Sequence, residues 1–162
     1  MKEDRDAVQL ANELFRRAYE CQMNGQLDEA IDLYKESIDL YPTAEAHTFL
    51  GWTYSFQGKL DEAIQECKIA IEIDPEFGNP YNDIGAYLIE KEEYEDAIPW
   101  LKKAIEAKRY ESYHFPHFNL GRVYVAQGMM RWAQEQFEKA LDLAPEYGLA
   151  MDALEHLKKQ IN

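Results

Sequence analysis

The histidines and cysteines are the side chains of this sequence best suited to metal binding or nucleophilic catalysis. His114 and His117 are three positions apart, so their imidazoles share one face if this segment is helical. A zinc site needs further ligands, and no cysteine or histidine pair at zinc-site spacing accompanies them. Cys21 and Cys67 are too few for the disulfide framework of a secreted domain, although one disulfide between them remains an alternative. We predict no metal and no cofactor.

Short catalytic motifs are absent from the sequence. It has neither a glycine-rich phosphate-binding loop nor a Gly-x-Ser-x-Gly nucleophile turn. Carboxylates are abundant, with 31 Asp and Glu against 17 Lys and Arg and a net charge of −14. Many are spaced so that they share the solvent side of a helix: Asp28, Glu29, Asp32, Glu36, Asp39, Asp61, Glu62 and Glu66. The sequence therefore predicts a protein that is not an enzyme.

The charge and the hydrophobic pattern limit the partners and the compartment. Nucleic acids and anionic membranes bind clustered Lys and Arg, so we expect neither as a partner. Residues 1–81 contain 7 basic and 17 acidic side chains, whereas residues 82–162 contain 10 and 14, which favours a basic partner segment near the amino-terminal half. The first residues are charged where a secretory signal would be apolar. A chain of 162 residues that is 46% hydrophobic predicts one globular, cytoplasmic domain.

A repeated motif indicates the elements that position these residues. Residues 25–31, 58–64 and 92–98 resemble one another, and a looser copy begins at Gly128. Their alanines are spaced 33, 34 and 36 positions apart, at Ala30, Ala63, Ala97 and Ala133. Around them, apolar residues recur every three or four positions, and glycines separate the apolar segments. Each unit therefore predicts a helix, a turn and a second helix.

This pattern resembles the tetratricopeptide repeat family, whose 34-residue helix pairs place small residues where the helices approach closely. The resemblance implies an all-α, right-handed α-solenoid in one domain over 1–162. Its parts would be four repeats and a capping helix, at about 11–43, 44–77, 78–113, 114–146 and 147–160. The histidines at 47 and 117 and both cysteines then occupy packing positions. Arg109 replaces an expected proline and two extra residues follow, so we expect a longer loop before the fourth repeat.

The resemblance also implies a concave binding groove lined by the first helix of each repeat. The residues at the groove positions of this chain, with Phe56 next to them, are Asn12, Phe15, Tyr19, Thr48, Trp52, Phe56, Asn79, Asn82, Phe115, Phe118 and Arg122. Aromatic rings suit apolar partner side chains, and Asn amides suit an extended backbone, although packing alone is an equal explanation for each ring. Trp52 is the strongest candidate, because its position has no packing role in the family and we expect an exposed indole.

We therefore predict a non-catalytic scaffold or adaptor that binds a peptide or helix of another protein. We expect this partner segment to contain apolar or aromatic side chains and some basic ones. The alternative is a self-associating structural protein that pairs through Val8, Leu10, Ala11 and Leu14. Family members that bind the acidic tails of heat-shock chaperones use a cluster of Lys, Arg and Asn. The equivalent positions here hold mainly aromatic, Asp and Asn residues, so we expect no tight binding of such tails.

Overall fold

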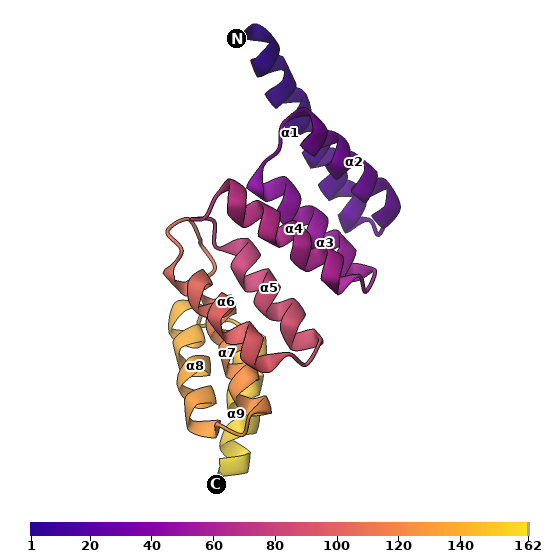
Figure 1. Cartoon of the computed structure of the whole chain (residues 1–162). Helices are drawn as coiled ribbons and strands as arrows, with labels where there is room; N and C mark the ends of the chain where they lie inside the picture. The colour runs from indigo at the N-terminus through magenta and orange to yellow at the C-terminus, as the bar shows by residue number, and fades with distance from the viewer. Residues whose placement is uncertain (162) are drawn as a thin grey trace. The chain divides into compact units, whose positions relative to one another are not determined.

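The computed structural model describes residues 1–161, and its regular elements in that range are helices (Figure 1). In chain order they are α1 (Lys2–Met23), α2 (Leu27–Leu40), α3 (Ala44–Phe56), α4 (Leu60–Ile73), α5 (Asn79–Glu90), α6 (Tyr94–Glu106), α7 (His114–Ala126), α8 (Met130–Leu143) and α9 (Gly148–Ile161). Successive helices pack in pairs, α1 with α2, α3 with α4, α5 with α6 and α7 with α8. The predicted all-α repeat fold is confirmed.

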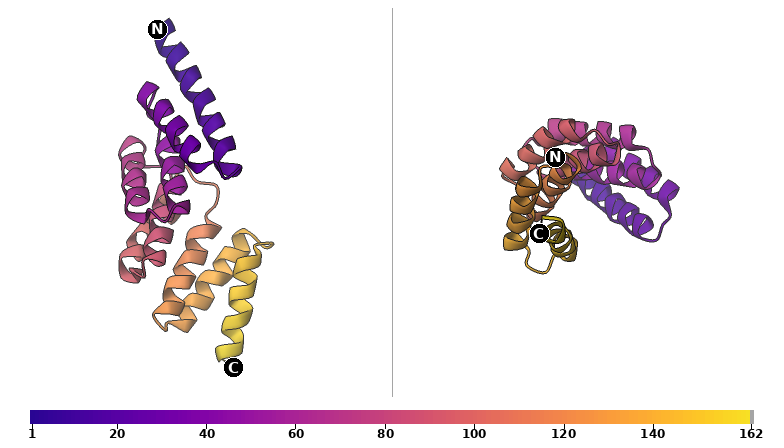
Figure 2. Two further views of the ribbon diagram at one scale, coloured as in Figure 1. Left: turned by 90° about the vertical axis from the view of Figure 1, so that its right-hand side faces the viewer. Right: turned by 90° about the horizontal axis from the view of Figure 1, so that it is seen from below.

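The chain divides into two compact units, unit 1 (Met1–Pro75) and unit 2 (Glu76–Asn162). In unit 1, α2 packs on α3, and α1 also contacts α3. In unit 2, α6 packs on α7 and α5 also contacts α7, while α8 packs on α9. Figure 2 shows α7, α8 and α9 side by side. Each unit therefore brings the first helices of its two repeats together. The expectation of one domain over 1–162 stays a prediction.

The turn inside each helix pair contains one residue with a positive φ. Gly25, Gly58 and Gly128 have φ values of 79°, 75° and 76°, which glycine adopts without steric cost. In the third repeat Glu92 takes this place with a φ of 61°. The glycine turns predicted from the sequence are therefore confirmed, and the third repeat makes the same turn without a glycine.

Gly51, Gly85 and Gly121 allow the paired helices to approach closely. A Cβ added at Gly121 would lie 2.3 Å from Cε1 of Phe137, and one added at Gly85 would lie 2.3 Å from Cδ2 of Leu101. The four alanines of the repeated motif are fully buried in the same helix pairs: Ala30, Ala63, Ala97 and Ala133. Because interiors are close-packed, these small residues fix the separation of the helices, as the sequence predicts.

Residues 107–113 form the long connection between α6 and α7 that the sequence predicts. The N–H of Arg109 donates to the carbonyl oxygen of Glu76 (2.9 Å), and the N–H of Gly78 donates to the carbonyl oxygen of Arg109 (3.0 Å). The Tyr110 ring covers Gly78, where an added Cβ would lie 2.5 Å from the ring. These contacts attach the connection to the first residues of unit 2.

The two ends of the chain are helical. α1 begins at Lys2, nine residues before the first repeat, and its first turns extend past the end of α2 (Figures 1 and 2). α9 occupies the place of the expected capping helix, with Ala150, Leu154 and Leu157 buried. No helix within residues 1–161 has the length and apolar character required to cross a membrane. The expected cytoplasmic location stays a prediction.

Candidate partner-binding faces

Aromatic side chains of α1 and α3 form a continuous series of ring contacts in unit 1. Phe49 lies at its centre, with the ring centroids of Phe15, Tyr19 and Trp52 at 5.2, 5.8 and 5.8 Å. Phe56 extends the series, because its ring lies 5.2 Å from that of Trp52. Edge-on ring pairs at such distances are stabilising. We call these five residues the aromatic row.

The aromatic row is exposed at its ends. Tyr19 is 40% exposed and Phe56 is 55% exposed, and Met23 at the end of α1 is also exposed. Trp52 is half-buried, because its ring packs between Phe49 and Phe56. The expectation that the Trp52 position has no packing role is therefore wrong. The exposed residues of the row are Tyr19 and Phe56, and Trp52 is half-buried.

The polar residues expected in the groove of unit 1 differ in exposure. Thr48 is only 3% exposed, and its hydroxyl donates to the carbonyl oxygen of Ala44 in its own helix (2.7 Å). The structure therefore corrects the expectation that Thr48 faces a partner. Asn12 is exposed and lines a shallow hollow of about 560 Å³, together with Val8 and Tyr41.

In unit 2 the polar side chains of α5 and α7 bond to each other. Nδ2 of Asn119 donates to Oδ1 of Asn82 (3.0 Å), and Nη1 of Arg122 donates to Oδ1 of Asn119 (3.1 Å). Asn82 is 8% exposed and also donates a hydrogen bond to the carboxyl group of Asp83. The amide of Asn82 is therefore used within the protein, which corrects its expected contact with a partner backbone. Arg122 remains exposed.

The aromatic residues of α7 gather around Tyr147, which directly precedes α9. The Tyr147 centroid lies 5.1, 5.6 and 5.2 Å from those of His114, Phe115 and Phe118. The Arg122 guanidinium lies 6.0 Å from the Phe118 centroid. Phe115 is exposed and Phe118 half-buried. The sequence argument missed Tyr147 because it lies outside the positions that the repeat pattern assigns to the groove.

Burial changes the acid–base properties of two groups near this face. Loss of solvation raises the pKa of Asp83 from 3.8 to about 7, and the hydrogen bond from Asn82 opposes this rise. Burial also lowers the pKa of His114, which favours its neutral form.

Asn79 is half-buried beside a hollow of about 210 Å³ that Tyr110 also lines.

The remaining histidines and the cysteines connect or fill helix pairs. Nδ1 of His47 lies 2.6 Å from Oε2 of Glu66, and Nδ1 of His117 lies 2.8 Å from Oε1 of Gln136. Both contacts join the first helix of a repeat to its second helix, so Glu66 is not simply a solvated surface acid. Cys67 is fully buried and Cys21 half-buried, and no disulfide joins them.

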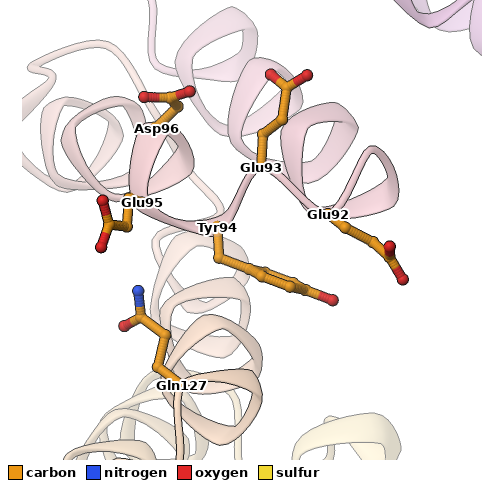
Figure 3. Close-up of a pocket in the computed structure, with 6 residues that line it drawn as sticks. All are labelled: Glu92, Glu93, Tyr94, Glu95, Asp96 and Gln127. Carbon is orange, nitrogen blue, oxygen red and sulfur yellow. The ribbon is translucent and has the colours of Figure 1, made fainter.

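One acidic hollow in unit 2 lies between the α5–α6 turn and the α7–α8 turn. It measures about 400 Å³ and is lined by Glu92, Glu93, Tyr94, Glu95, Asp96 and Gln127. In Figure 3 the side chains of Glu92 and Glu95 point to opposite sides, while those of Glu93 and Asp96 both point upward. Across residues 1–161, no three or more His, Cys, Asp or Glu side chains are placed to hold a metal ion.

The amino-terminal residues proposed for self-association are mostly engaged within unit 1. Ala11 and Leu14 are buried and Val8 is half-buried. Leu10 is exposed. The structure therefore corrects the expectation of a four-residue apolar surface, because only Leu10 presents much of its side chain to solvent.

Comparison with family models matches almost the whole repeat region. One model described as "Tetratricopeptide repeat" matches residues 11–44 and 114–147, and a second with the same description matches 44–77 and 79–110. These ranges agree with the helix pairs of the structure. The repeat bounds expected from the sequence lie within three residues of these matches and stay a prediction.

Curated relatives are much longer than this chain. Mitochondrial import receptor subunit TOM70 of Rattus norvegicus is 27% identical over 136 residues, which cover 81% of this chain and 22% of the receptor. Small glutamine-rich tetratricopeptide repeat-containing protein 2 of Mycosarcoma maydis is 32% identical over 78 residues, 48% of this chain and 22% of that protein. The chain therefore spans about a fifth of the length of these relatives.

Solved structures share the fold. The pilF structure from Pseudomonas aeruginosa has a TM-score of 0.89 at 21% identity, over 96% of this chain and 70% of that chain. A MamA structure has a TM-score of 0.73 at 26% identity, over 88% and 83%. The first TPR of Spaghetti (RPAP3), bound to the HSP90 peptide SRMEEVD, has a TM-score of 0.68 at 21% identity, over 74% and 93%.

Proposed function

Because the chain belongs to the tetratricopeptide repeat family, we propose that it is a non-catalytic scaffold or adaptor that binds a peptide or helix of another protein. The binding surfaces are the exposed sides of α1 and α3 in unit 1 and of α5 and α7 in unit 2. A peptide occupies the related fold of RPAP3, which supports a peptide as the class of ligand. The observation that carries the proposal is the aromatic row, whose exposed rings at Tyr19 and Phe56 lack the cover that core aromatics have.

The chemistry of the two surfaces describes the partner. Exposed Tyr and Phe rings bury apolar or aromatic side chains, which are common anchors of interfaces. Unit 1 contains 7 basic and 16 acidic residues, so a partner segment with Lys or Arg gains long-range attraction there. Direct contacts come from Asn12, Tyr19, Trp52, Phe56, Phe115 and Arg122, while Thr48 and Asn82 support the surfaces from within.

Capture of partners from native lysate tests this function. Phe56→Ala removes the most exposed ring of the aromatic row and should reduce the recovery of captured proteins at least fivefold relative to the wild type. Ile69→Ala is a matched control, because Ile69 is also an exposed apolar residue of unit 1 but lies on the second helix α4. Equal recovery with both variants and the wild type would show that the aromatic row is not a partner-binding surface.

Self-association is the second function that the sequence suggested. Only Leu10 of the proposed surface is substantially exposed, and the negative charge of the chain opposes contact between copies. Light scattering over a range of concentrations separates the two functions, because a scaffold keeps the mass of a monomer.

A further inference from the structure

The shallow hollow of about 560 Å³ in unit 1 lies at the start of α1, and none of the five residues of the aromatic row lines it. It forms where α1 extends past the end of α2 (Figures 1 and 2). The hydroxyl of Ser37 near the end of α2 donates to the carbonyl oxygen of Ala11 (2.7 Å), and Tyr41 follows one turn later, beside earlier residues of α1. The lining residues are Asp4, Arg5, Val8, Gln9, Asn12, Arg16 and Tyr41.

The lining residues of α1, apart from Asp4, share one face of the helix. Counted from Arg5, they follow three, four, seven and eleven positions later, which is the spacing of one side of an α-helix. Arg5 and Arg16 are the two ends of this face, with Val8 and two side-chain amides between them. At 1.5 Å per residue, the two arginines are about 16 Å apart along the helix. We call this face the arginine face.

The two arginines of the arginine face are not used within the protein. Both are exposed, and within residues 1–161 neither guanidinium forms an ion pair or a hydrogen bond. Exposed Glu13 and Glu20 lie three and four positions from Arg16, at spacings that favour ion pairs on a helix, but no such pair forms here. Each guanidinium therefore has all of its N–H donors available for a ligand.

We propose that the arginine face binds an extended acidic segment of a partner protein, with two carboxylates about five residues apart. Each carboxylate accepts two parallel hydrogen bonds from Arg5 or Arg16. At 3.3 Å per residue, five residues of an extended chain span about 16 Å, which matches the separation of the two arginines. An apolar side chain between the carboxylates lies against Val8 and the ring of Tyr41, which is 48% exposed.

The polar side chains of the hollow fit the same ligand. The amides of Gln9 and Asn12 are exposed and offer both donors and acceptors to an extended backbone. Asp4 is the acidic side chain of the lining. It precedes Arg5 and its side chain is 90% exposed, so water and salt screen its charge.

Charge restricts the occupant to a short segment with few acids. Unit 1 contains 7 basic and 16 acidic residues, so the unit as a whole repels a polyanion such as nucleic acid. For two carboxylates, salt at 0.1 M screens this repulsion beyond about 10 Å, whereas the hydrogen-bonded contacts with the guanidinium groups remain. The inference rests on the proposed function for its class of ligand, a peptide. It adds a second surface whose charge preference is opposite to that of the aromatic row.

The test uses the acetylated and amidated peptide Glu-Ser-Leu-Gly-Ser-Glu, which has two carboxylates five positions apart. In an NMR titration of the full chain, it should shift the backbone signals of residues 5–16 and of Tyr41. Arg5→Gln and Arg16→Gln should each weaken binding at least fivefold, because each removes one charged contact. Arg17→Gln is the matched control and should stay within about twofold of the wild type, since Arg17 is an exposed arginine of α1 outside the lining.

Three further probes identify the chemistry that the arginine face recognises. The peptide Gln-Ser-Leu-Gly-Ser-Gln keeps the leucine but not the charges, and it should bind at least fivefold more weakly. The peptide Lys-Ser-Leu-Gly-Ser-Lys and the oligonucleotide hexathymidylate should leave the signals of residues 5–16 unchanged. Binding of any of these three probes as strongly as the acidic peptide would overturn the proposal.

The variants give further ways to overturn it. An equal loss in Arg16→Gln and Arg17→Gln would show a general effect of charge rather than a site. If the acidic peptide shifts the signals of residues 52–56 instead of residues 5–16, or shows no saturable binding, the arginine face is not its site. Capture from lysate with Phe56→Ala reports on the aromatic row, so the proposed function and the arginine face can each fail alone.

Discussion

Unit 1 and unit 2 place different chemistry at equivalent positions of their repeats. Phe49 in the second repeat and Asn119 in the fourth occupy the sixth position, and Trp52 and Arg122 both occupy the ninth. In unit 1 this pair is a ring contact of 5.8 Å, whereas in unit 2 it is a hydrogen bond of 3.1 Å. The same turn of helix therefore supports an apolar surface in one unit and a polar one in the other.

The small residues at the contact between paired helices are the same in both units. Gly51 and Gly121 occupy one repeat position, and both lie where an added Cβ would meet the second helix of the pair. Ala63 and Ala133 are fully buried in those same pairs. The comparison shows that packing requirements constrain a few small residues strictly, while the exposed side of each first helix is free to differ.

The largest expected effect comes from breaking the shared packing. Gly121→Val should lower the free energy of unfolding by about 3 kcal/mol or more, because its side chain overlaps the buried ring of Phe137. Thermal unfolding followed by circular dichroism measures this loss. Gly148→Ala is the control, since an added Cβ there meets nothing within 4 Å, and its stability should stay within about 0.5 kcal/mol of the wild type. Similar losses for both variants would contradict the close-packing argument.

A smaller effect distinguishes the polar interior of unit 2 from the apolar row of unit 1. The pKa of Asp83 rises from 3.8 to about 7 on folding, so between these values the folded state holds a proton that the unfolded state has released. The contribution of protonated Asp83 to the free energy of unfolding is therefore fully present below pH 3.8 and is lost as the pH rises to about 7.

Asp83→Asn removes this dependence. The stability of the variant relative to the wild type should increase by about 2 kcal/mol between pH 5 and pH 8, a value reduced for the partial exposure of the side chain. Urea unfolding at the two pH values measures the change. A stability difference that does not vary with pH would show that Asp83 titrates normally in the folded protein.

The smallest expected effect separates support from contact within the aromatic row. Trp52→Ala should lower the free energy of unfolding by about 1.5 kcal/mol, because the half-buried indole packs on Phe49 and Phe56. Phe56→Ala should change it by about 0.5 kcal/mol or less, since Phe56 is 55% exposed. Urea unfolding at one pH compares the two variants. Equal losses would mean that Phe56 is as much a packing residue as Trp52.

Repeat spacing predicts most of the fold from the sequence. The intervals between alanines, with glycine turns and helical periodicity, locate the four helix pairs and the capping helix. The candidate surfaces are less predictable, because the position of a residue in a repeat predicts the helix face on which it lies but not the residues that it contacts. Thr48 and Asn82 have groove positions yet are buried, and Asn119 and Tyr147 lie outside the groove pattern yet link its residues.

The sequence by itself determined the elements of this protein, because helix periodicity, turn glycines and small packing residues act over a few neighbouring positions. Only the tertiary structure decided which polar side chains meet. Asn82 and Asn119 are 37 positions apart and bond because α5 and α7 lie against each other. Burial likewise raises the pKa of Asp83, and desolvation depends on everything packed around a group rather than on its neighbours in sequence.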